Sequence, residues 1–331
     1  MNLSIGKLRG LQAISDDAGF LTICAIDHRQ ALQRAMNQQN PDAVTYQDMV
    51  DFKLDLCRAV APFVSAVLLD PVYGAAQAVA AGILPGDIGL LVSLEKTGYS
   101  GEKTARITEL LPGWSVEKVK RMGASAVKLL VYFRPDLKEI ASRQLALIAK
   151  VADQCIKEDI PLLVEPVSYP VEEVGVFSPK FAYMKPGLVI ETARQITALP
   201  IDILKAEFPA DTKFEHDEKK LLQLCQKLDR ASRLPWVLLS AGADFGTFSK
   251  QVEIACKAGA SGFLAGRALW QEGVQIRSRE ERMSFFKNTA VTRLKELAGI
   301  VKRYGKPWYA KIGSDRGEFE PINEGWYEQY D

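Results

Sequence analysis

Short apolar runs alternate with longer segments of helical periodicity along most of the chain. Eight of these runs predict buried strands, because each is apolar at nearly every position and too short for an average helix. Their ranges are Phe20–Ile26, Ser65–Asp70, Gly89–Glu95, Ala126–Phe133, Pro161–Val167, Asp202–Phe208, Pro235–Ser240 and Ala260–Gly266. Strands that are apolar on both faces are typical of a parallel sheet covered by helices.

A segment with helical spacing of apolar residues follows each predicted strand. The predicted helices span Pro41–Ala61, Ala75–Ala81, Ser115–Met122, Leu137–Lys157, Leu188–Ala198, Glu218–Ala231, Phe248–Ala258 and Glu280–Tyr304. Eight strand–helix units in 331 residues predict a closed (β/α)8 barrel, the TIM barrel, rather than an open doubly wound sheet. We expect one barrel domain over residues 1–304 and an irregular C-terminal extension over residues 305–331, which are rich in aromatic residues and lack periodicity.

A lysine lies in the middle of the sixth predicted strand, within Asp202-Ile-Leu-Lys-Ala-Glu-Phe-Pro209. Alternation along the strand places Ile203, Lys205 and Glu207 on one face. Burial disfavours an ammonium, so we expect a lowered pKa for Lys205 and a fraction of free amine that can form a Schiff base with a carbonyl. The alternative is a strand-end lysine that reaches water or pairs with Glu207.

Polar residues stand at the ends of the predicted strands, where the active sites of such barrels lie. They are Asp27, Asp70, Glu95, Lys128, Glu165, Lys205, Ser240 and Arg267. We expect Lys128 to lie near Lys205 and, as a like charge, to lower its pKa further. Glu165 is the preferred general acid and base, because burial is expected to raise its pKa toward the working range. Taken singly, each of these residues is compatible with an ordinary loop charge or a salt bridge in the bottom layer, but eight polar groups that converge on one mouth argue for a site.

The last two predicted strands end in sequences suited to an anion. Leu239-Ser-Ala-Gly242 and Gly266-Arg267 provide a hydroxyl, a guanidinium and glycines that let backbone N–H groups approach a phosphate. Phosphate sites after strands 7 and 8 recur in these barrels. For Gly242 or Gly266 alone, a tight turn is the simpler interpretation.

Composition narrows the classes of partner. Lys and Arg number 42 against 41 Asp and Glu, so no overall field favours nucleic acid or an anionic membrane, and any anion site must be local.

The sequence has no signal-peptide pattern and no apolar run of membrane-spanning length, which predicts a cytoplasmic protein. Two histidines, His28 and His216, cannot form a histidine-rich zinc site, and five widely spaced cysteines suit reduced core thiols. We therefore predict no metal.

Seven motifs, in order between about Gly19 and Trp308, resemble the class I tagatose 1,6-bisphosphate aldolases. They are Asp27-His-Arg29, Leu69–Gly74, Leu94–Tyr99, Ala126–Leu130, Ile203–Glu207, Leu239–Gly242 and Gly266–Trp270. The resemblance implies a (β/α)8 barrel that cleaves a ketohexose bisphosphate reversibly to dihydroxyacetone phosphate and glyceraldehyde 3-phosphate, without a metal or other cofactor. By matching motif, Lys205 resembles the Schiff-base lysine and Glu165 the acid/base. Asp27 and Lys128 resemble groups that orient substrate oxygens, and Ser240 and Arg267 look like phosphate ligands.

Other substrates and functions remain open at this stage. Pro235–Ser240 and Ala260–Trp270 are similar to the sulfofructose 1-phosphate aldolases, a sister group that uses the same lysine and yields dihydroxyacetone phosphate and sulfolactaldehyde. His28 stands where the tagatose enzymes usually have Gln. Extra cations at the second anion site, such as Arg29 or Lys96, would favour a bisphosphate over a sulfonate.

The alternative of another class is a sugar-phosphate sensor that does not turn its ligand over. A mere binder has no physical reason to bury Lys205 and Glu165 together, which argues for the enzyme. In either case the expected partner is a small sugar phosphate. Assembly into a homo-oligomer is left open by the sequence.

Overall fold

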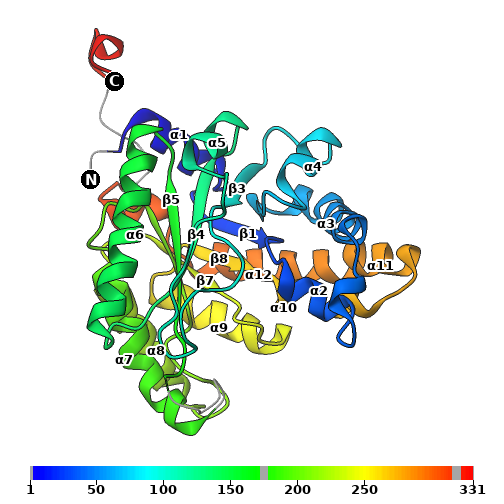
Figure 1. The fold of residues 1–331 in the computed structure, drawn as a ribbon. Coiled ribbons are helices and arrows are strands. Elements are labelled where there is room, and N and C mark those ends of the chain that lie inside the picture. The colour runs from blue at the N-terminus through cyan, green and yellow to red at the C-terminus, as the bar shows by residue number, and fades with distance from the viewer. Residues whose placement is uncertain (1–2, 172–177, 315–321, 331) are drawn as a thin grey trace.

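The computed structural model describes residues 3–171, 178–314 and 322–330 (Figure 1). In these ranges eight parallel strands pair in chain order, and β8 pairs with β1 to close a barrel. The strands are β1 (Leu21–Ala25), β2 (Ala66–Leu69), β3 (Gly89–Ser93), β4 (Ala126–Tyr132), β5 (Leu162–Val167), β6 (Ile203–Ala206), β7 (Trp236–Leu239) and β8 (Gly262–Ala265). The predicted (β/α)8 barrel is confirmed, and each strand lies inside its predicted range.

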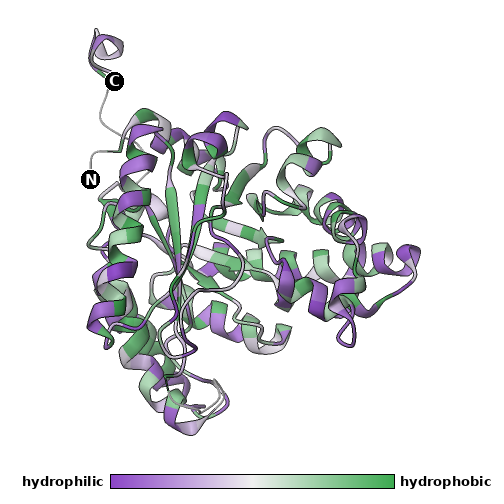
Figure 2. Cartoon of the chain, in the orientation of Figure 1, coloured by the Kyte–Doolittle hydropathy of each residue, from purple (hydrophilic) through white to green (hydrophobic). Residues whose placement is uncertain are grey.

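Helices surround the strands and turn their polar faces outward (Figures 1 and 2). They are α1 (Ile5–Ala13), α2 (Gln30–Met36), α3 (Tyr46–Val60), α4 (Ala75–Ala80), α5 (Val116–Arg121), α6 (Lys138–Lys157), α7 (Pro179–Ile196), α8 (Glu218–Ala231), α9 (Phe245–Ala258), α10 (Arg267–Trp270), α11 (Arg279–Phe285) and α12 (Val291–Tyr304). The sequence did not predict α1, α2 or α10. Their patterns are short, and α10 directly continues the β8 motif.

Two predicted helices begin five or more residues from their expected starts, and α9 begins three residues early, at Phe245. The helix expected from Pro41 starts at Tyr46, because the Thr45 side chain caps it in a reciprocal capping box with Asp48. Residues Pro41–Ala43 form a separate 3-10 turn.

The helix expected from Leu188 begins at Pro179, where the Ser178 hydroxyl accepts a hydrogen bond from the Phe181 N–H. Pro186 lies inside this helix, although proline usually marks a break. The last predicted helix is two helices, α11 and α12, joined by a π-helical turn at Phe286–Ala290.

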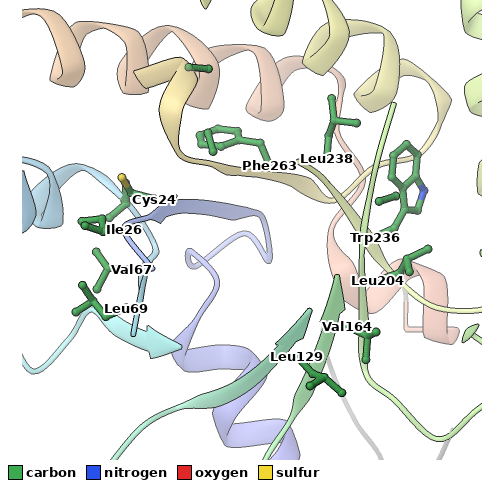
Figure 3. Packing of buried hydrophobic residues seen from close by; sticks show 14 of the residues in the cluster. Cys24, Ile26, Val67, Leu69, Leu129, Val164, Leu204, Trp236, Leu238 and Phe263 are labelled. Atoms are coloured by element: carbon green, nitrogen blue, oxygen red, sulfur yellow. The ribbon is translucent and has the colours of Figure 1, made fainter. Parts of the chain in front are cut away.

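The strands bury side chains on both faces. Outward-facing residues such as Val67, Leu129 and Trp236 pack beneath the helices (Figure 3). Inward-facing residues form a second cluster inside the barrel, with Ala126 from β4, Leu163 from β5 and Ile203 from β6 among its members. Because alternate residues share a face, the positions two residues further along these strands also face the barrel interior, one layer nearer the carboxyl ends. Those positions are Lys128, Glu165 and Lys205.

The amino end of the barrel is closed by apolar side chains. Leu11 and Ile14, in and just after α1, belong to the interior cluster together with Trp308 from the predicted extension. The Trp308 N–H donates to the Gly19 carbonyl at 3.0 Å. The beginning of the extension therefore packs against the barrel, whereas Trp326 is 41% exposed. Residues 315–321 and 331 of the extension lie outside the described ranges, and the division at residue 304 stays a prediction.

All five cysteines are buried and unpaired, as expected for reduced core thiols. Burial raises the pKa of Cys57, Cys155 and Cys256 to about 12, so these thiols are weak nucleophiles at neutral pH. Among the described helices, none has the length and apolar content needed to cross a membrane.

Candidate active site

Three carboxylates converge on Lys128 inside the barrel. The Lys128 Nζ lies 2.8 Å from an Asp27 oxygen, 2.7 Å from a Glu95 oxygen and 3.0 Å from a Glu165 oxygen. Asp27 follows β1, Glu95 follows β3, and Lys128 and Glu165 lie on β4 and β5. Of the three N–H donors of the ammonium, two make hydrogen bonds to Asp27 and Glu95, and Glu165 adds an ion pair. Lys128 is 1% exposed, and it holds the carboxylates in fixed positions.

Glu165 links Lys128 to Lys205. Its Oε1 lies 2.7 Å from the Lys205 Nζ, and its Oε2 faces Lys128. Lys205 is only 4% exposed, so the alternative of a lysine that reaches water is wrong. We refer to Asp27, Glu95, Lys128, Glu165 and Lys205 as the charged cluster.

Pairing of Lys205 with Glu207, the other sequence alternative, is also wrong. Strand β6 ends at Ala206, and the Glu207 carboxylate accepts a hydrogen bond from the Ser168 N–H at 2.7 Å. Its other oxygen lies 3.9 Å from the Lys185 Nζ on α7. The alternation that predicts a common face for Lys205 and Glu207 therefore stops where the strand stops.

Within the charged cluster, Lys128 and the carboxylates of Asp27 and Glu165 favour each other's ionised forms. Burial opposes ionisation of Asp27, but Lys128, His28 and Lys205 outweigh it and bring its pKa well below the usual range. Burial likewise opposes the Lys128 ammonium, yet Asp27, Glu165 and Glu95 raise its pKa well above the ordinary value. Lys128 is thus a permanent cation whose charge is compensated locally.

The expected raised pKa of Glu165 is wrong in the free protein. Burial does push this pKa upward, but the attraction of Lys128 and Lys205 is larger and lowers it. A carboxylate that is already ionised needs no prior deprotonation before it accepts a proton.

Three other residues near the strand ends have defined partners. Asp70 pairs with Lys53 of α3 at 2.6 Å, and both side chains are fully buried. Arg29 donates from Nη2 to the Glu95 carbonyl at 2.6 Å, which brings it beside the cluster. Lys96 faces Glu109 at 3.3 Å with 55% of its side chain exposed, so it does not join the cluster.

The predicted anion residues meet at the ends of β7 and β8. The Ser240 carbonyl accepts from the Ala243 N–H at 2.8 Å across a tight turn in which Ala241 and Gly242 both have positive φ. A Cβ at Gly242 would lie 3.0 Å from Nη2 of Arg267 and 3.1 Å from Cζ. Within the described ranges Arg267 forms no ion pair, although it is partly buried. A half-buried guanidinium without a carboxylate, next to a glycine turn, is suited to a phosphate.

His28 stands between the anion residues and the charged cluster. Its ring packs edge-on against Trp270, with centroids 5.1 Å apart, and its Nδ1 lies 3.7 Å from an Asp27 oxygen. A Cβ at Gly266 would lie 2.7 Å from the His28 Cε1, so this glycine permits a close approach. Burial lowers the pKa of His28 to about 4, against the opposing attraction of Asp27. The imidazole is therefore neutral at pH 7.

Two groups were underestimated from the sequence. Glu95 was noted only as a strand-end polar residue, yet it holds both Lys128 and the Leu130 N–H at 3.0 Å. Lys53 was not noted, although its Nζ donates to the Ile26 carbonyl at 2.5 Å, directly before Asp27. The signal was available, because Lys53 lies four residues after Met49 on the apolar face of α3.

Among the described residues, no group of three or more His, Cys, Asp or Glu side chains is placed to hold a metal ion. The three carboxylates of the charged cluster surround an ammonium instead. The absence of a metal from the chemistry itself stays a prediction.

A closed (β/α)8 barrel with a buried lysine beside a carboxylate defines a class of enzyme scaffold suited to Schiff-base chemistry. Residues 21–272 match the model of the DeoC/LacD family aldolases. The chain belongs to this family, and the protein is an aldolase.

Individual relatives cover nearly the whole chain. Tagatose 1,6-diphosphate aldolase 1 of Enterococcus faecalis is 34% identical over 328 residues, covering 94% of this chain and 99% of its own. Tagatose 1,6-diphosphate aldolase of Lactococcus lactis is 31% identical over 329 residues, covering 94% and 100%. The solved structure of fructose-bisphosphate aldolase from Plasmodium falciparum matches with a TM-score of 0.70 at 14% identity, covering 92% and 98%, and so supports the fold.

Proposed function

We propose that this aldolase forms a Schiff base at Lys205 and reversibly cleaves a ketohexose 1,6-bisphosphate, either tagatose or fructose 1,6-bisphosphate. The products are dihydroxyacetone phosphate and glyceraldehyde 3-phosphate. The observation that carries the proposal is the contact of 2.7 Å between the Lys205 Nζ and Glu165 inside the barrel. A lysine amine beside a carboxylate has what imine formation needs, a nucleophile and a proton acceptor. The names of the Enterococcus and Lactococcus relatives support the substrate class.

The proposed reaction begins when Glu165 takes a proton from Lys205. The neutral amine attacks the C2 carbonyl, Glu165 returns its proton to the hydroxyl of the carbinolamine, and that hydroxyl leaves as water to give an iminium. A base removes the proton of the C4 hydroxyl, and the C3–C4 bond breaks to release the aldehyde phosphate and leave an enamine. Protonation at C3 and hydrolysis of the iminium return dihydroxyacetone phosphate and the free lysine. Glu165 is the base we assign to the C4 hydroxyl.

Other residues bind and orient the substrate in this proposal. Arg267, Ser240 and the glycine turns at Gly242 and Gly266 hold the C1 phosphate, because guanidinium, hydroxyl and backbone N–H groups are its usual ligands. Asp27 binds a substrate hydroxyl. Lys128 already faces three carboxylates, so its main role is to hold Asp27 and Glu165 in place. Family membership favours this enzyme over the non-catalytic sensor.

Borohydride trapping followed by intact and peptide mass measurement tests the proposal. With dihydroxyacetone phosphate we expect one reduced adduct on Lys205 in the presence of EDTA. Lys205→Met should give none, whereas Lys157→Met, a matched change at an exposed lysine of α6, should trap as wild type. No adduct, an adduct elsewhere, or activity that EDTA abolishes and zinc restores would disprove the Schiff base.

The substrate itself is decided by kcat/KM for tagatose 1,6-bisphosphate, fructose 1,6-bisphosphate and sulfofructose 1-phosphate under the same conditions. We expect the bisphosphates to be preferred. A preference for the sulfonate above about tenfold, equivalent to roughly 1.4 kcal/mol of transition-state binding, would assign the protein to sulfofructose 1-phosphate instead.

A further inference from the structure

An arginine is held by three tyrosine rings beyond the charged cluster. The Arg106 guanidinium carbon lies 4.7 Å from the ring centre of Tyr99, 5.5 Å from that of Tyr132 and 4.8 Å from that of Tyr169. The rings also contact one another edge-on, at 5.1 Å between Tyr99 and Tyr132 and 6.4 Å between Tyr132 and Tyr169. We call these four residues the tyrosine cage.

Each tyrosine of the tyrosine cage lies the same number of residues along the chain after a member of the charged cluster. Each tyrosine stands four positions after a cluster member on three neighbouring strands or their ends: Glu95 and Tyr99, Lys128 and Tyr132, Glu165 and Tyr169. In β4, which contains both members of its pair, an even spacing keeps the two side chains on the inward face. Four strand residues span about 13 Å, so the cage lies toward the open, carboxyl end of the barrel.

Backbone contacts fix Arg106 in this place. The segment that carries it folds back on itself, with Ser100 and Ile107 exchanging N–H to carbonyl hydrogen bonds at 2.9 Å each way. The Arg106 Nε donates to the Lys103 carbonyl at 3.0 Å, and the Gln144 amide donates to the Arg106 carbonyl at 3.2 Å. The guanidinium is therefore oriented before any ligand arrives.

The outer edge of this guanidinium is unused. Within the described ranges Arg106 forms no ion pair, and its two terminal nitrogens make no hydrogen bond. Arg134, by contrast, is paired with Asp136 at 2.6 Å. A half-buried arginine that is oriented by aromatic rings and lacks a carboxylate presents a planar pair of donors, the arrangement that binds phosphate or sulfonate oxygens.

The cage and Arg267 lie on opposite sides of the barrel mouth. Arg267 follows β8, whereas the cage stands over β3, β4 and β5, and in the closed strand order β4 is four strands from β8 in either direction. Lys205 on β6 lies between them in the strand order. This arrangement suits a ligand with an anion at each end and its carbonyl in between.

We propose that Arg106, oriented by Tyr99, Tyr132 and Tyr169, binds the anionic group at the C6 end of the ketose. The inference rests on the proposed function and supplies its second anion site. Arg29 and Lys96 are weaker candidates, because Arg29 donates to the Glu95 carbonyl and Lys96 faces Glu109. The cage recognises a tetrahedral anion by shape and charge, so it serves a phosphate or a sulfonate.

The condensation direction isolates this site, since dihydroxyacetone phosphate is common to every reaction. We would measure kcat/KM for three aldehyde acceptors: glyceraldehyde 3-phosphate, 3-sulfolactaldehyde and glyceraldehyde. Arg106→Met should lower the value for the wild type's preferred anionic acceptor about 10- to 100-fold, the loss of one or two charged hydrogen bonds. For glyceraldehyde, which has no anion, the change should stay within about twofold. The wild type's preferred anionic acceptor identifies which anion the cage serves.

Two controls make the result decisive. Arg143→Met, a matched loss of an exposed arginine on α6, should leave all three values unchanged. Arg106→Lys keeps a cation against the rings but loses the planar pair of donors. The ratio of its kcat/KM for the anionic acceptor to its kcat/KM for glyceraldehyde should therefore fall between the ratios of the wild type and of Arg106→Met. If Arg106→Met does not fold, Arg106→Lys decides the question. Borohydride trapping of dihydroxyacetone phosphate should stay at the wild-type level in both variants.

Equal losses for all acceptors, or no loss for the anionic ones, would overturn the assignment of Arg106 while trapping at Lys205 continued. Failure of the wild type itself to trap dihydroxyacetone phosphate would instead overturn the proposed function, and this inference with it.

Discussion

Lys128→Met tests whether the charged cluster is held together as the contacts indicate. The change keeps the length of the side chain but removes an ammonium that lies within 3.0 Å of three carboxylates. Breaking a buried ion pair by deleting one partner typically costs 3–5 kcal/mol, because the remaining charge stays buried without compensation. We expect a loss of this order, roughly 3–5 kcal/mol, in the free energy of unfolding at pH 8.

The loss of unfolding free energy in Lys128→Met should depend on pH, and the pKa shifts in the cluster fix the direction of that dependence. In the wild type the pKa of Asp27 and of Glu165 is lowered by the lysines, so their stabilisation is present above the unfolded pKa of about 4 and disappears only below it. Without Lys128, burial dominates and raises the pKa of Asp27 in the folded protein above that unfolded value. A group with a raised folded pKa destabilises as pH rises through it. Glu165 keeps Lys205, so Asp27 should give the larger response.

The deficit of Lys128→Met relative to wild type should therefore be smaller at pH 5 than at pH 8. Each unit by which the folded pKa of Asp27 rises above 5 returns about 1.4 kcal/mol at pH 5, and we expect a recovery of this order. Urea titrations at both pH values, followed by the fluorescence of the five tryptophans, measure it. Lys157→Met should show no deficit at either pH. A deficit that is equal or larger at pH 5 would refute the electrostatic reasoning.

Two further predictions concern single residues. Glu165→Gln should lower kcat roughly 10²- to 10⁴-fold, the usual contribution of a positioned acid/base, while still allowing some borohydride trapping at Lys205; normal turnover would move the role to Asp27. A histidine with a folded pKa of about 4 and an unfolded pKa of about 6.5 opposes folding as pH falls from 7 to 5. Replacing it in His28→Gln removes this effect, so the free energy of unfolding of the variant, relative to wild type, should be roughly 2 kcal/mol higher at pH 5 than at pH 7. Paired urea titrations measure the difference, and equal pH dependence of the two proteins would contradict it.

The fold, and the inward orientation of the Lys205 side chain on β6, could be predicted from the local pattern of apolar and polar residues. Eight apolar runs separated by helical segments allow few architectures in a chain of this length, and period-2 alternation fixes which strand residues face inward. The same rule failed at Glu207, because it holds only while the strand continues, and β6 ends at Ala206. Pro186 and Gly187 similarly concealed the first half of α7, since tertiary packing overrides the local preference against proline.

The partners of the charged groups could not be predicted from local pattern. Asp27 and Lys128 are 101 residues apart, and their contact depends on how far each side chain reaches across the closed barrel. This gap explains the error at Glu165: burial alone predicts a raised pKa, and only the two lysines reverse it. The sequence does contain a pattern for the tyrosine cage, because its tyrosines lie four residues after Glu95, Lys128 and Glu165. That signal becomes meaningful only when β3, β4 and β5 are known to be neighbours.

The charges of the cluster are suited to the proposed reaction, in which a lysine takes the role that a metal ion would otherwise have. In the proposed reaction the iminium at Lys205 carries one positive charge, as an ammonium does, and Glu165, 2.7 Å from the Lys205 Nζ, is placed to attract it. The carboxylate that positions the resting lysine is thus already placed to stabilise the cationic intermediate, without rearrangement of the buried site. Lys128 supplies the remaining compensation: with three carboxylates and two lysines, the five groups carry one net negative charge before and after imine formation. If the proposed reaction is correct, a site with this balance favours a cation on the substrate at the step in which the C3–C4 bond would break.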